Sequence, residues 1–337
     1  MSWYHIPGSE QDTVISTRVR FARNLTEYPF TSRLDATRAR EMLGRVGEVL
    51  EKNGFTRVDF ADISRTTAQS LVEKHYASPA FVKESLPHAL FLNEPCNLSV
   101  MVCEEDHIRL QCILPGLSLK DAYGGACKVE GLLDNAFSLA FDKRLGYLTG
   151  CPSNLGTAMR VSVMLCLPML TVGHRLETLS HQLGQTGLLL RGLFGEGSSP
   201  SGGLVQISNR VTLGLSEEEI LSRMAPAIDR IIDTERRLRA SVTGIELDKL
   251  TDRILRAEGT LRYAHTLSAS EMLPLLSDMR LGAAMGLLKG VRVEALTTLL
   301  VEAMPATLTL SQQSAPRCDH ERDILRARLV KERLFGE

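Results

Sequence analysis

The predicted secondary structure of the chain changes at about Ala240, from mixed strands and helices to helices alone. This change constrains the fold more than any other feature of the sequence. Before that point, short strand-like segments are mixed with helical ones, whereas the later segments are leucine-rich and helical. Strands that come in clusters favour a largely antiparallel sheet over a parallel one. We therefore predict an α+β domain over residues 1–240, with its sheet flanked by helices, followed by a small all-helical domain over residues 241–337.

The expected elements follow from hydrophobic periodicity and capping residues. We expect a helix capped by Asp35 and running to about Lys52, a second over 118–141, and one that begins after Ser216 with three glutamates. Strands are expected at 55–60, 89–92, 98–102, 107–114, 160–167, 188–194 and 204–207. The second domain is expected to have helices at 245–258, 267–290, 292–304 and 318–334.

Composition excludes several classes of protein. The 337 residues include 39 basic and 40 acidic side chains, so no overall charge favours nucleic acid or an anionic membrane. Seven cysteines without a CxxC pair argue against a disulfide framework and a zinc site. Without a secretory leader or an 18-residue apolar run in the sequence, we expect a cytoplasmic protein.

A turn-rich segment, Cys151-Pro152-Ser153-Asn154-Leu155-Gly156-Thr157, stands immediately before a strand-like run. Turn residues at that density fix a backbone conformation, and a reactive thiol would suit such an exposed place near positive charge. The alternative is that Cys151 is a small buried hydrophobe, as most lone cysteines are.

Arginines recur on strand-like or turn segments. Arg18 and Arg20 are two residues apart, which places both on one face of a strand. Guanidinium groups near a sheet are costly unless anions pair with them, and several together suit a triphosphate. The alternative is that each one pairs with a neighbouring carboxylate. The full set comprises Arg18, Arg20, Arg109, Arg160 and Arg191.

Two carboxylates lie close to these arginines in the sequence. Glu105 precedes the strand that carries Arg109, and Glu196 follows Arg191 at the start of the glycine- and serine-rich segment 195–203. That segment is either a linker or a mobile loop of an active site. Acidic runs such as 104–106 are usually solvated surface, which is the alternative to a catalytic role. Neither a Walker motif nor a kinase-type glycine loop is present.

Taken in order, these segments resemble the phosphagen (guanidino) kinase family. The matching segments are Ser16–Arg20, Glu104–Arg109, Cys151–Thr157, Arg191–Glu196, Ile207–Asn209 and Leu213–Ser216. Leu71–His75 resembles the family's segment with a nucleotide-contacting histidine. The resemblance covers about residues 12–240 and implies a phosphagen-kinase-like catalytic domain.

Two features indicate the branch of bacterial protein-arginine kinases (McsB type). Small-molecule guanidino kinases have a helical domain before the first arginine motif, whereas only 15 residues precede Ser16 here. Arg322-Asp323-Ile324-Leu325-Arg326-Ala327 also matches the RDxxRA phosphoarginine-binding motif of that branch. Arginines suit the phosphoryl group and aspartate suits the guanidinium, so the resemblance implies an allosteric phosphoarginine site at Arg322, Asp323 and Arg326. The alternative is a solvated charged helix.

The resemblance implies roles for the site residues. Glu105 and Glu196 would grip separate guanidinium nitrogens, with Glu105 as general base, and Cys151 would be a thiolate that positions the guanidinium. ATP, with Mg²⁺ bridging its phosphate oxygens, would bind the arginines, and His75 would contact the nucleotide. The residues implied to bind ATP are Ser16, Thr17, Arg18, Val19, Arg20, His75, Arg109, Arg160, Val161, Ser162, Val163, Met164, Arg191, Gly192, Leu193, Phe194 and Gly195.

The implied function is ATP-dependent phosphorylation of arginine side chains in proteins. The family further suggests a stress-response role in protein quality control, with a Clp ATPase, an activator protein and a heat-shock repressor as partners, and a homodimer through the helical domain is a further expectation. Two alternatives stay open: a kinase of free guanidino compounds such as arginine, and a silent adaptor that binds phosphoarginine.

Overall fold

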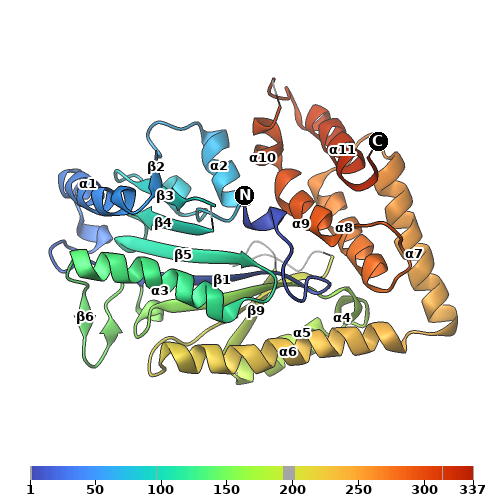
Figure 1. Ribbon diagram of the computed structural model, residues 1–337, viewed down its shortest axis with the longest axis horizontal. Coiled ribbons are helices and arrows are strands. Elements are labelled where there is room, and N and C mark those ends of the chain that lie inside the picture. The colour runs from blue at the N-terminus through green and yellow to red at the C-terminus, as the bar shows by residue number, and fades with distance from the viewer. Residues whose placement is uncertain (1, 96, 193–201, 313, 337) are drawn as a thin grey trace.

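A computed structural model describes residues 2–95, 97–192, 202–312 and 314–336 of the chain (Figure 1). The strands are β1 (Val14–Arg23), β2 (Phe55–Asp59), β3 (Ala89–Asn93), β4 (Leu98–Val102), β5 (Ile108–Pro115), β6 (Phe141–Asp142), β7 (Gly146–Tyr147), β8 (Met159–Cys166), β9 (Leu188–Gly192) and β10 (Leu204–Asn209). The α-helices are α1 (Ala36–Lys52), α2 (Arg65–Glu73), α3 (Leu119–Ala136), α4 (Pro168–Val172), α5 (Leu176–Gln185), α6 (Glu217–Ser241), α7 (Gly244–Tyr263), α8 (Ala269–Ala284), α9 (Val293–Glu302), α10 (Pro305–Leu310) and α11 (Asp319–Phe335).

Eight of the strands form one sheet in the order β2-β3-β4-β5-β1-β8-β10-β9. Every pairing in it is antiparallel, and helices flank it. The α+β fold with a largely antiparallel sheet and a C-terminal helical region is therefore confirmed.

Capping side chains begin two of the predicted helices. The Asp35 carboxylate accepts hydrogen bonds from the backbone N–H groups of Thr37 and Arg38, both at 2.9 Å. At the start of α6, Ser216 and Glu219 form a reciprocal capping box. Both signals are local in sequence, which explains why they could be read from it.

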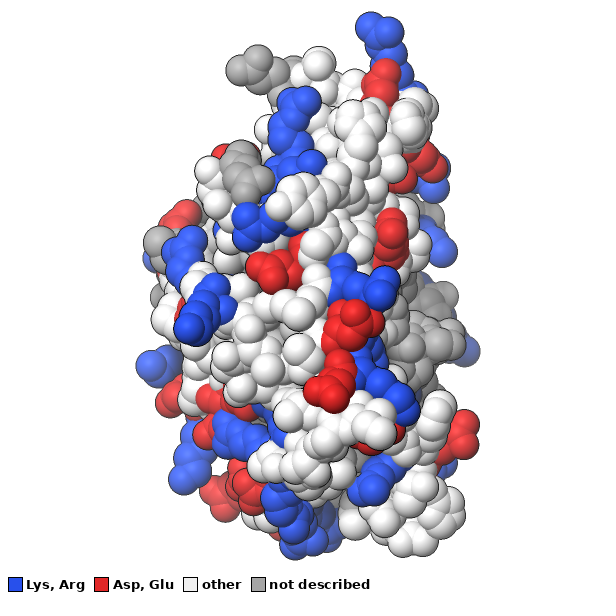
Figure 2. All heavy atoms as spheres, turned by 90° about the vertical axis from the view of Figure 1, so that its right-hand side faces the viewer, with Lys and Arg blue, Asp and Glu red and all other residues white. Residues whose placement is uncertain are grey.

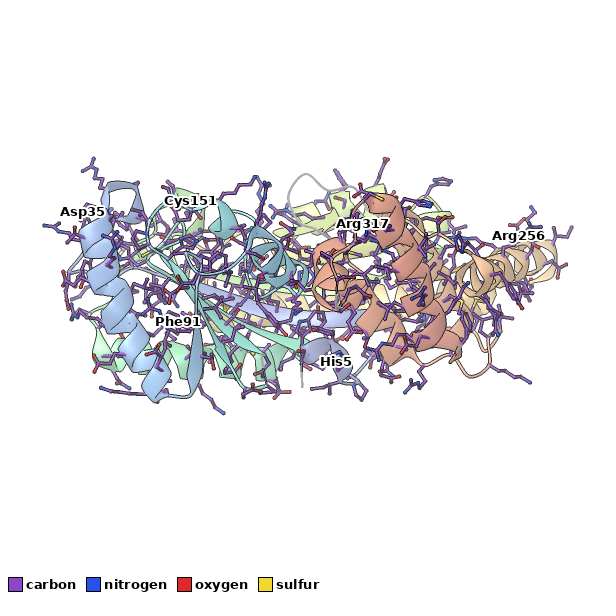
Figure 3. The ribbon with its side chains drawn as sticks, turned by 90° about the horizontal axis from the view of Figure 1, so that it is seen from above. His5, Asp35, Phe91, Cys151, Arg256 and Arg317 are labelled. Atoms are coloured by element: carbon purple, nitrogen blue, oxygen red, sulfur yellow. The ribbon has the colours of Figure 1, made fainter. Side chains whose placement is uncertain are left out.

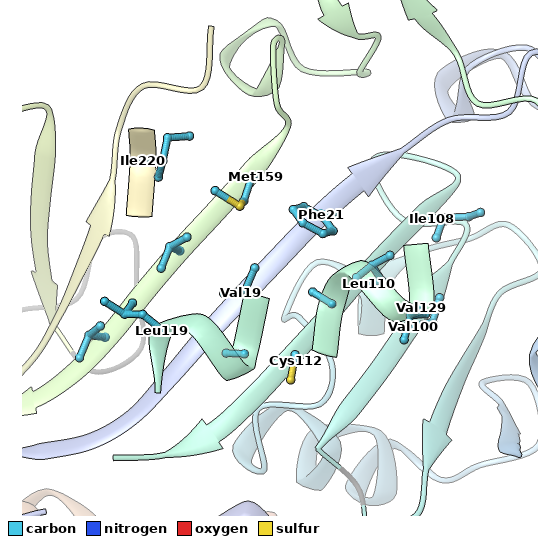
Figure 4. Packing of buried hydrophobic residues seen from close by; sticks show 14 of the residues in the cluster. Val19, Phe21, Val100, Ile108, Leu110, Cys112, Leu119, Val129, Met159 and Ile220 are labelled. Carbon is cyan, nitrogen blue, oxygen red and sulfur yellow. The ribbon is translucent and has the colours of Figure 1, made fainter. Parts of the chain in front are cut away.

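One face of the sheet packs a hydrophobic core against α1, α3 and α6 (Figure 4). Val19, Phe21, Leu110, Cys112 and Met159 project into this core and are essentially inaccessible to solvent. Alternate residues of the same strands must therefore project from the opposite face.

The opposite face of the sheet carries a second apolar cluster at one end. It joins Trp3, Tyr4, Ile113 and Met164 to buried residues of the C-terminal helices. Seen from above, Cys151 lies over the sheet, while Arg317 and Arg256 lie on the helical side (Figure 3). The division at residue 240 stays a prediction, because this cluster has members from both sides of it.

Two expected helices differ in extent, and α2, α4 and α5 have no counterpart among the expected elements. The helix expected over 118–141 ends at Ala136, because residues 137–140 instead pair with the chain after β1, with the N–H of Ala140 donating to the carbonyl of Asn24 at 2.7 Å. The helix expected over 267–290 ends at Ala284, where Gly286 and Gly290 have positive φ angles. The short helix α10 was not predicted.

Acidic and basic side chains are interspersed over the face formed by the C-terminal helices (Figure 2). No helix within the described ranges is long and apolar enough to cross a membrane.

Candidate active site

A cavity of about 370 Å³ lies against the sheet face opposite the α1, α3 and α6 core. It brings together all five arginines singled out from the sequence, together with His75, Glu105 and Cys151. Its lining also includes Ser78, Gln111, Ser153, Asn154 and Gln206, which were not among the predicted site residues. Long-range strand pairing therefore creates the site.

The strand order explains why the arginines converge. Arg20 on β1 stands opposite Gln111 on β5 and Arg160 on β8. Arg191 on β9 stands opposite Gln206 on β10, which in turn pairs with β8. Side chains that pair across neighbouring antiparallel strands share a face, so guanidinium groups distant in sequence face one cavity.

Positive charge is concentrated in this cavity. Burial, followed by the charges of Arg109 and Arg160, lowers the pKa of Arg18 to about 10. Burial, followed by the same kind of repulsion from Arg18, holds the pKa of Arg20 well below its usual range. Such a cluster is costly for the fold unless an anion binds it.

The arginine cluster has the donors that a phosphate group needs. Among the described residues, no carboxylate forms an ion pair with Arg18 or Arg20, and the buried Nε of Arg20 has no hydrogen-bond partner. A polyanion such as the triphosphate of ATP supplies the missing acceptors. The residues present therefore fit ATP.

The acidic run 104–106 is not solvated surface. Glu104 is buried and pairs with Arg109, with 2.5 Å between its Oε2 and the arginine NH1. Asp106 is also buried, and its Oδ1 accepts hydrogen bonds from the N–H of Gly150 and from Nδ2 of Asn24, both at 2.6 Å. Only the middle residue, Glu105, is exposed and lines the cavity. The roles of Glu104 and Asp106 could not be inferred from the sequence.

Glu105 and Cys151 both line the cavity, where Sγ of Cys151 lies 3.0 Å from Oγ of Ser153. Partial burial, followed by the charge of Asp106, raises the pKa of the Glu105 carboxyl group. A carboxylate with a raised pKa is a stronger base, which suits proton abstraction.

The cysteine turn is held rigidly by its surroundings. Thr149 donates to the carbonyl of Cys151 at 2.8 Å, and Thr212 donates to that of Leu155 at 2.7 Å. Gly156 has a φ of +99°, and a Cβ there would lie 2.1 Å from the Thr212 carbonyl oxygen, so only glycine fits. Cys151 is half-buried rather than part of the core.

His75 follows α2 and has a left-handed φ of +62°, unusual for a residue with a Cβ. Its carbonyl accepts a hydrogen bond from Nε2 of Gln111 at 2.5 Å. Burial, followed by the charge of Arg18, lowers the pKa of His75 to about 3. The imidazole is therefore neutral, which suits contact with an uncharged part of a nucleotide.

The other residues implied to bind ATP lie beside or behind the cavity. On the side of the sheet that packs against α1, α3 and α6 lie the side chains of Thr17, Val19, Val161 and Val163. On the side that carries the arginines, the side chains of Ser16, Ser162 and Met164 are buried. None of these seven, nor Gly192, is among the lining residues. Their side chains do not reach the cavity, because alternation along each strand turns half of them away and packing covers the rest.

Four predicted site residues, Leu193, Phe194, Gly195 and Glu196, lie outside the described residues. Their implied roles stay predictions.

The C-terminal motif is more buried than expected. The Arg326 side chain is buried, with Nε donating to the carbonyl of Ala303 and NH1 to that of Leu267, both at 2.8 Å, and it also pairs with Asp323. Arg322 pairs with Asp319 at 2.6 Å and remains partly exposed. Arg326 therefore faces the interior of the helical region, and the implied phosphoarginine-binding roles of Arg322, Asp323 and Arg326 stay predictions.

Comparison with known proteins identifies the fold and the family. Residues 39–238 match the family model described as ATP:guanido phosphotransferase, C-terminal catalytic domain. A solved duplicated taurocyamine kinase from Schistosoma mansoni, with bound transition-state analog components, is similar with a TM-score of 0.62 and 24% identity; the match covers 74% of this chain and 38% of that one. The chain belongs to the ATP:guanido phosphotransferase family, whose members use ATP as phosphoryl donor.

The remaining matches define the branch. Residues 247–336 match the model described as Protein-arginine kinase McsB C-terminal domain. The chain is 40% identical to a protein-arginine kinase of Desulforamulus reducens over 98% of this chain and 95% of that relative. It is 39% identical to one of Brevibacillus brevis over 99% of this chain and 95% of that relative. Within its family the chain is thus a member of the protein-arginine kinases.

Proposed function

We propose that the cavity transfers the γ-phosphoryl group of ATP to arginine side chains of proteins. The observation that carries the proposal is the meeting of five arginines from four strands with Glu105 and Cys151 in one cavity. Arginine clusters stabilise the charge of a transferring phosphoryl group, and a carboxylate is the group that binds and deprotonates a guanidinium.

In the proposed reaction, the arginine cluster holds the triphosphate and orients its γ-phosphorus toward Glu105. The Glu105 carboxylate accepts a proton from the substrate guanidinium, whose nitrogen attacks the γ-phosphorus as the bond to the β-phosphate oxygen breaks. ADP leaves, and phosphoarginine remains on the protein. Mg²⁺ bound to the phosphate oxygens would neutralise part of their charge.

Cys151 and Glu196 complete the proposed guanidinium site. The presence of Cys151 and Glu105 in the lining of one cavity supports a positioning role for the thiol beside the same guanidinium. Glu196 is proposed from the family motif alone, as the second carboxylate. Glu196→Gln should abolish turnover and leave ATP binding largely intact.

The central experiment incubates the protein with Mg·ATP and an unfolded model protein, and then maps acid-labile phosphate by mass spectrometry. Phosphate on arginine side chains is the expected result. Label only on free arginine would instead support a small-molecule guanidino kinase, and binding of phosphoarginine without turnover would support an adaptor. Glu105→Gln serves as the inactive control.

We also propose a regulatory role for the C-terminal motif. The partly exposed Arg322 and Asp323 are the groups available to a phosphoarginine ligand, while Arg326 would orient Asp323 from the interior. Arg322→Ala and Asp323→Ala should weaken phosphoarginine binding, measured by calorimetry, without lowering basal turnover. Unchanged binding in both variants would contradict the regulatory role.

The cellular setting is proposed from the family resemblance. We propose that the enzyme acts in the cytoplasm in a stress response, in which modified proteins are delivered to a Clp protease and a heat-shock repressor is inactivated. An activator protein and a homodimer through the helical region belong to the same proposal.

A further inference from the structure

A second cavity, of about 490 Å³, lies next to the catalytic cavity and shares Glu105 as part of its wall. It is enclosed by the turn around Thr31, the segment after Phe81, the turn that contains Glu104 and Glu105, and Gly150. Its lining residues are Thr31, Ser32, Leu34, Glu84, Ser85, Leu86, Glu104, Glu105 and Gly150. The proposed function does not use this space.

The charge of the second cavity is opposite to that of the first. Glu84, Glu104 and Glu105 line it, and no lysine or arginine does. Arg109 forms an ion pair with Glu104 and its charge also acts on Glu105, but it lines the first cavity and not the second. Glu105 therefore separates a cationic cavity for phosphate from an anionic one.

Thr31, one of the lining residues, carries an unpartnered polar group. Thr31 is 9% exposed, and its buried Oγ1 atom has no hydrogen-bond partner among the described residues. Its segment is fixed by His107, whose Nε2 lies 2.8 Å from the carbonyl oxygen of Pro29. A buried hydroxyl without a partner indicates a polar ligand at this position.

The carboxylates fit an organic cation better than a metal ion. Within the described residues, no three His, Cys, Asp or Glu side chains are arranged to hold a metal. The volume exceeds what an ion needs and accommodates an extended side chain. Lysine and arginine combine such a chain with a terminal cation that carboxylates and a hydroxyl can bind.

We propose that the second cavity binds a basic side chain that flanks the target arginine in a protein substrate. The inference rests on the proposed function, in which the target guanidinium lies at Glu105. Because Glu105 also borders the second cavity, a residue next to the target arginine is within reach of Glu84 and Thr31. Glu84 is then a specificity-determining residue, and a lysine or arginine neighbour favours phosphorylation.

The test compares three peptides of equal length that contain a single arginine flanked by lysine, by alanine or by glutamate. The native enzyme should favour the lysine-flanked peptide over the alanine-flanked one about tenfold in kcat/KM, as expected for one close charge pair, and should disfavour the glutamate-flanked peptide. Equal kcat/KM values for the three peptides would overturn the proposal.

Glu84→Gln removes the charge and keeps the oxygen that accepts hydrogen bonds from the N–H groups of Ser85 and Leu86, at 2.7 and 3.1 Å. It should reduce the preference to about twofold without changing kcat/KM for the alanine-flanked peptide. Thr31→Val should also reduce the preference. The matched control, Glu51→Gln on the exposed side of α1, should retain it. An equal loss on all peptides in Glu84→Gln would show a structural role and contradict the proposal.

A binding measurement separates this proposal from the proposed function. Calorimetry uses the lysine-flanked peptide with citrulline in place of the target arginine. Binding that weakens in Glu84→Gln supports the second cavity even if no phosphoarginine forms, in which case the proposed function fails alone. Arginine phosphorylation with no lysine preference would leave the proposed function intact and reject the second cavity.

Discussion

Two groups of arginines look alike in the sequence but differ in the structure. Arg18 and Arg20 on β1 face a cavity, and no described carboxylate pairs with them. Arg326 on α11 is buried more deeply than Arg18 and Arg20, and it donates to two backbone carbonyls and to Asp323. Their surroundings support the proposed ligand binding by Arg18 and Arg20, and a structural role for Arg326 in the helical region.

Arg23 shows that the difference does not come from the type of secondary structure. It lies on β1, three residues after Arg20, yet its side chain is buried against Glu130, with 2.5 Å between NH2 and Oε1. A buried cation with a partner is part of the fold, whereas one without a partner indicates a missing anion. The presence of a carboxylate partner, rather than burial, distinguishes Arg23 from Arg18 and Arg20.

Among the arginine variants, Arg20→Ala should give the largest effect on activity. Loss of a guanidinium that contacts phosphate should lower kcat/KM at least 100-fold. The unfolding free energy should stay equal or rise, because repulsion from Arg18, Arg109 and Arg160 is relieved. Steady-state kinetics and urea denaturation measure the two effects, with Arg40→Ala on the exposed surface of α1 as control. A destabilised Arg20→Ala protein would indicate a structural role for Arg20 and contradict the difference proposed between Arg20 and Arg326.

Arg326→Ala should have the opposite effect. Removing it leaves two carbonyls and Asp323 without their donor, so the unfolding free energy should fall by about 3 kcal/mol. Basal kcat at a temperature where the variant is folded should stay close to native. Arg328→Ala, exposed on the same helix, is the matched control for urea denaturation. Native stability in Arg326→Ala would refute the structural assignment.

Asp106→Ala tests a buried charge that supports the active site indirectly. Without the hydrogen bond to the Gly150 N–H, the turn that carries Cys151 should lose its position, and kcat should fall about tenfold to thirtyfold. Asp142→Ala removes a carboxylate that also accepts two backbone hydrogen bonds, but in the β6–β7 hairpin, and should leave kcat unchanged. Equal kcat losses in both variants would exclude a specific role for Asp106.

On stability, the smallest effect is expected for the inactive variant Glu105→Gln, in which only the pH dependence of stability should change. The pKa of Glu105 is raised above 4.5 in the folded protein, so its ionised form destabilises the fold. Native stability relative to Glu105→Gln should fall as pH rises from about 4.5 through the raised pKa. Melting temperatures at pH 4 and pH 7.5 measure this: the variant should be the more stable protein only at pH 7.5. A variant less stable at pH 7.5 would contradict the sign.

Much of the site could be predicted because its signals are local. Alternation along β1 placed Arg18 and Arg20 on one face, and the order of motifs indicated the family. The acidic run was harder to interpret, because Glu104, Glu105 and Asp106 are adjacent and chemically alike. Only the turn between β4 and β5 shows that the outer two are buried and the middle one faces the cavity.

The sequence by itself predicted most element types, two helix caps, a two-part organisation of the chain and the residues proposed to carry the chemistry. Tertiary structure alone decided which arginines lack a protein partner, that Arg326 is internal, and that Glu105 separates two cavities of opposite charge. The physical reason is range: propensity, capping and alternation act between neighbours along the chain, whereas the partner of a buried charge is set by strands and helices distant in sequence.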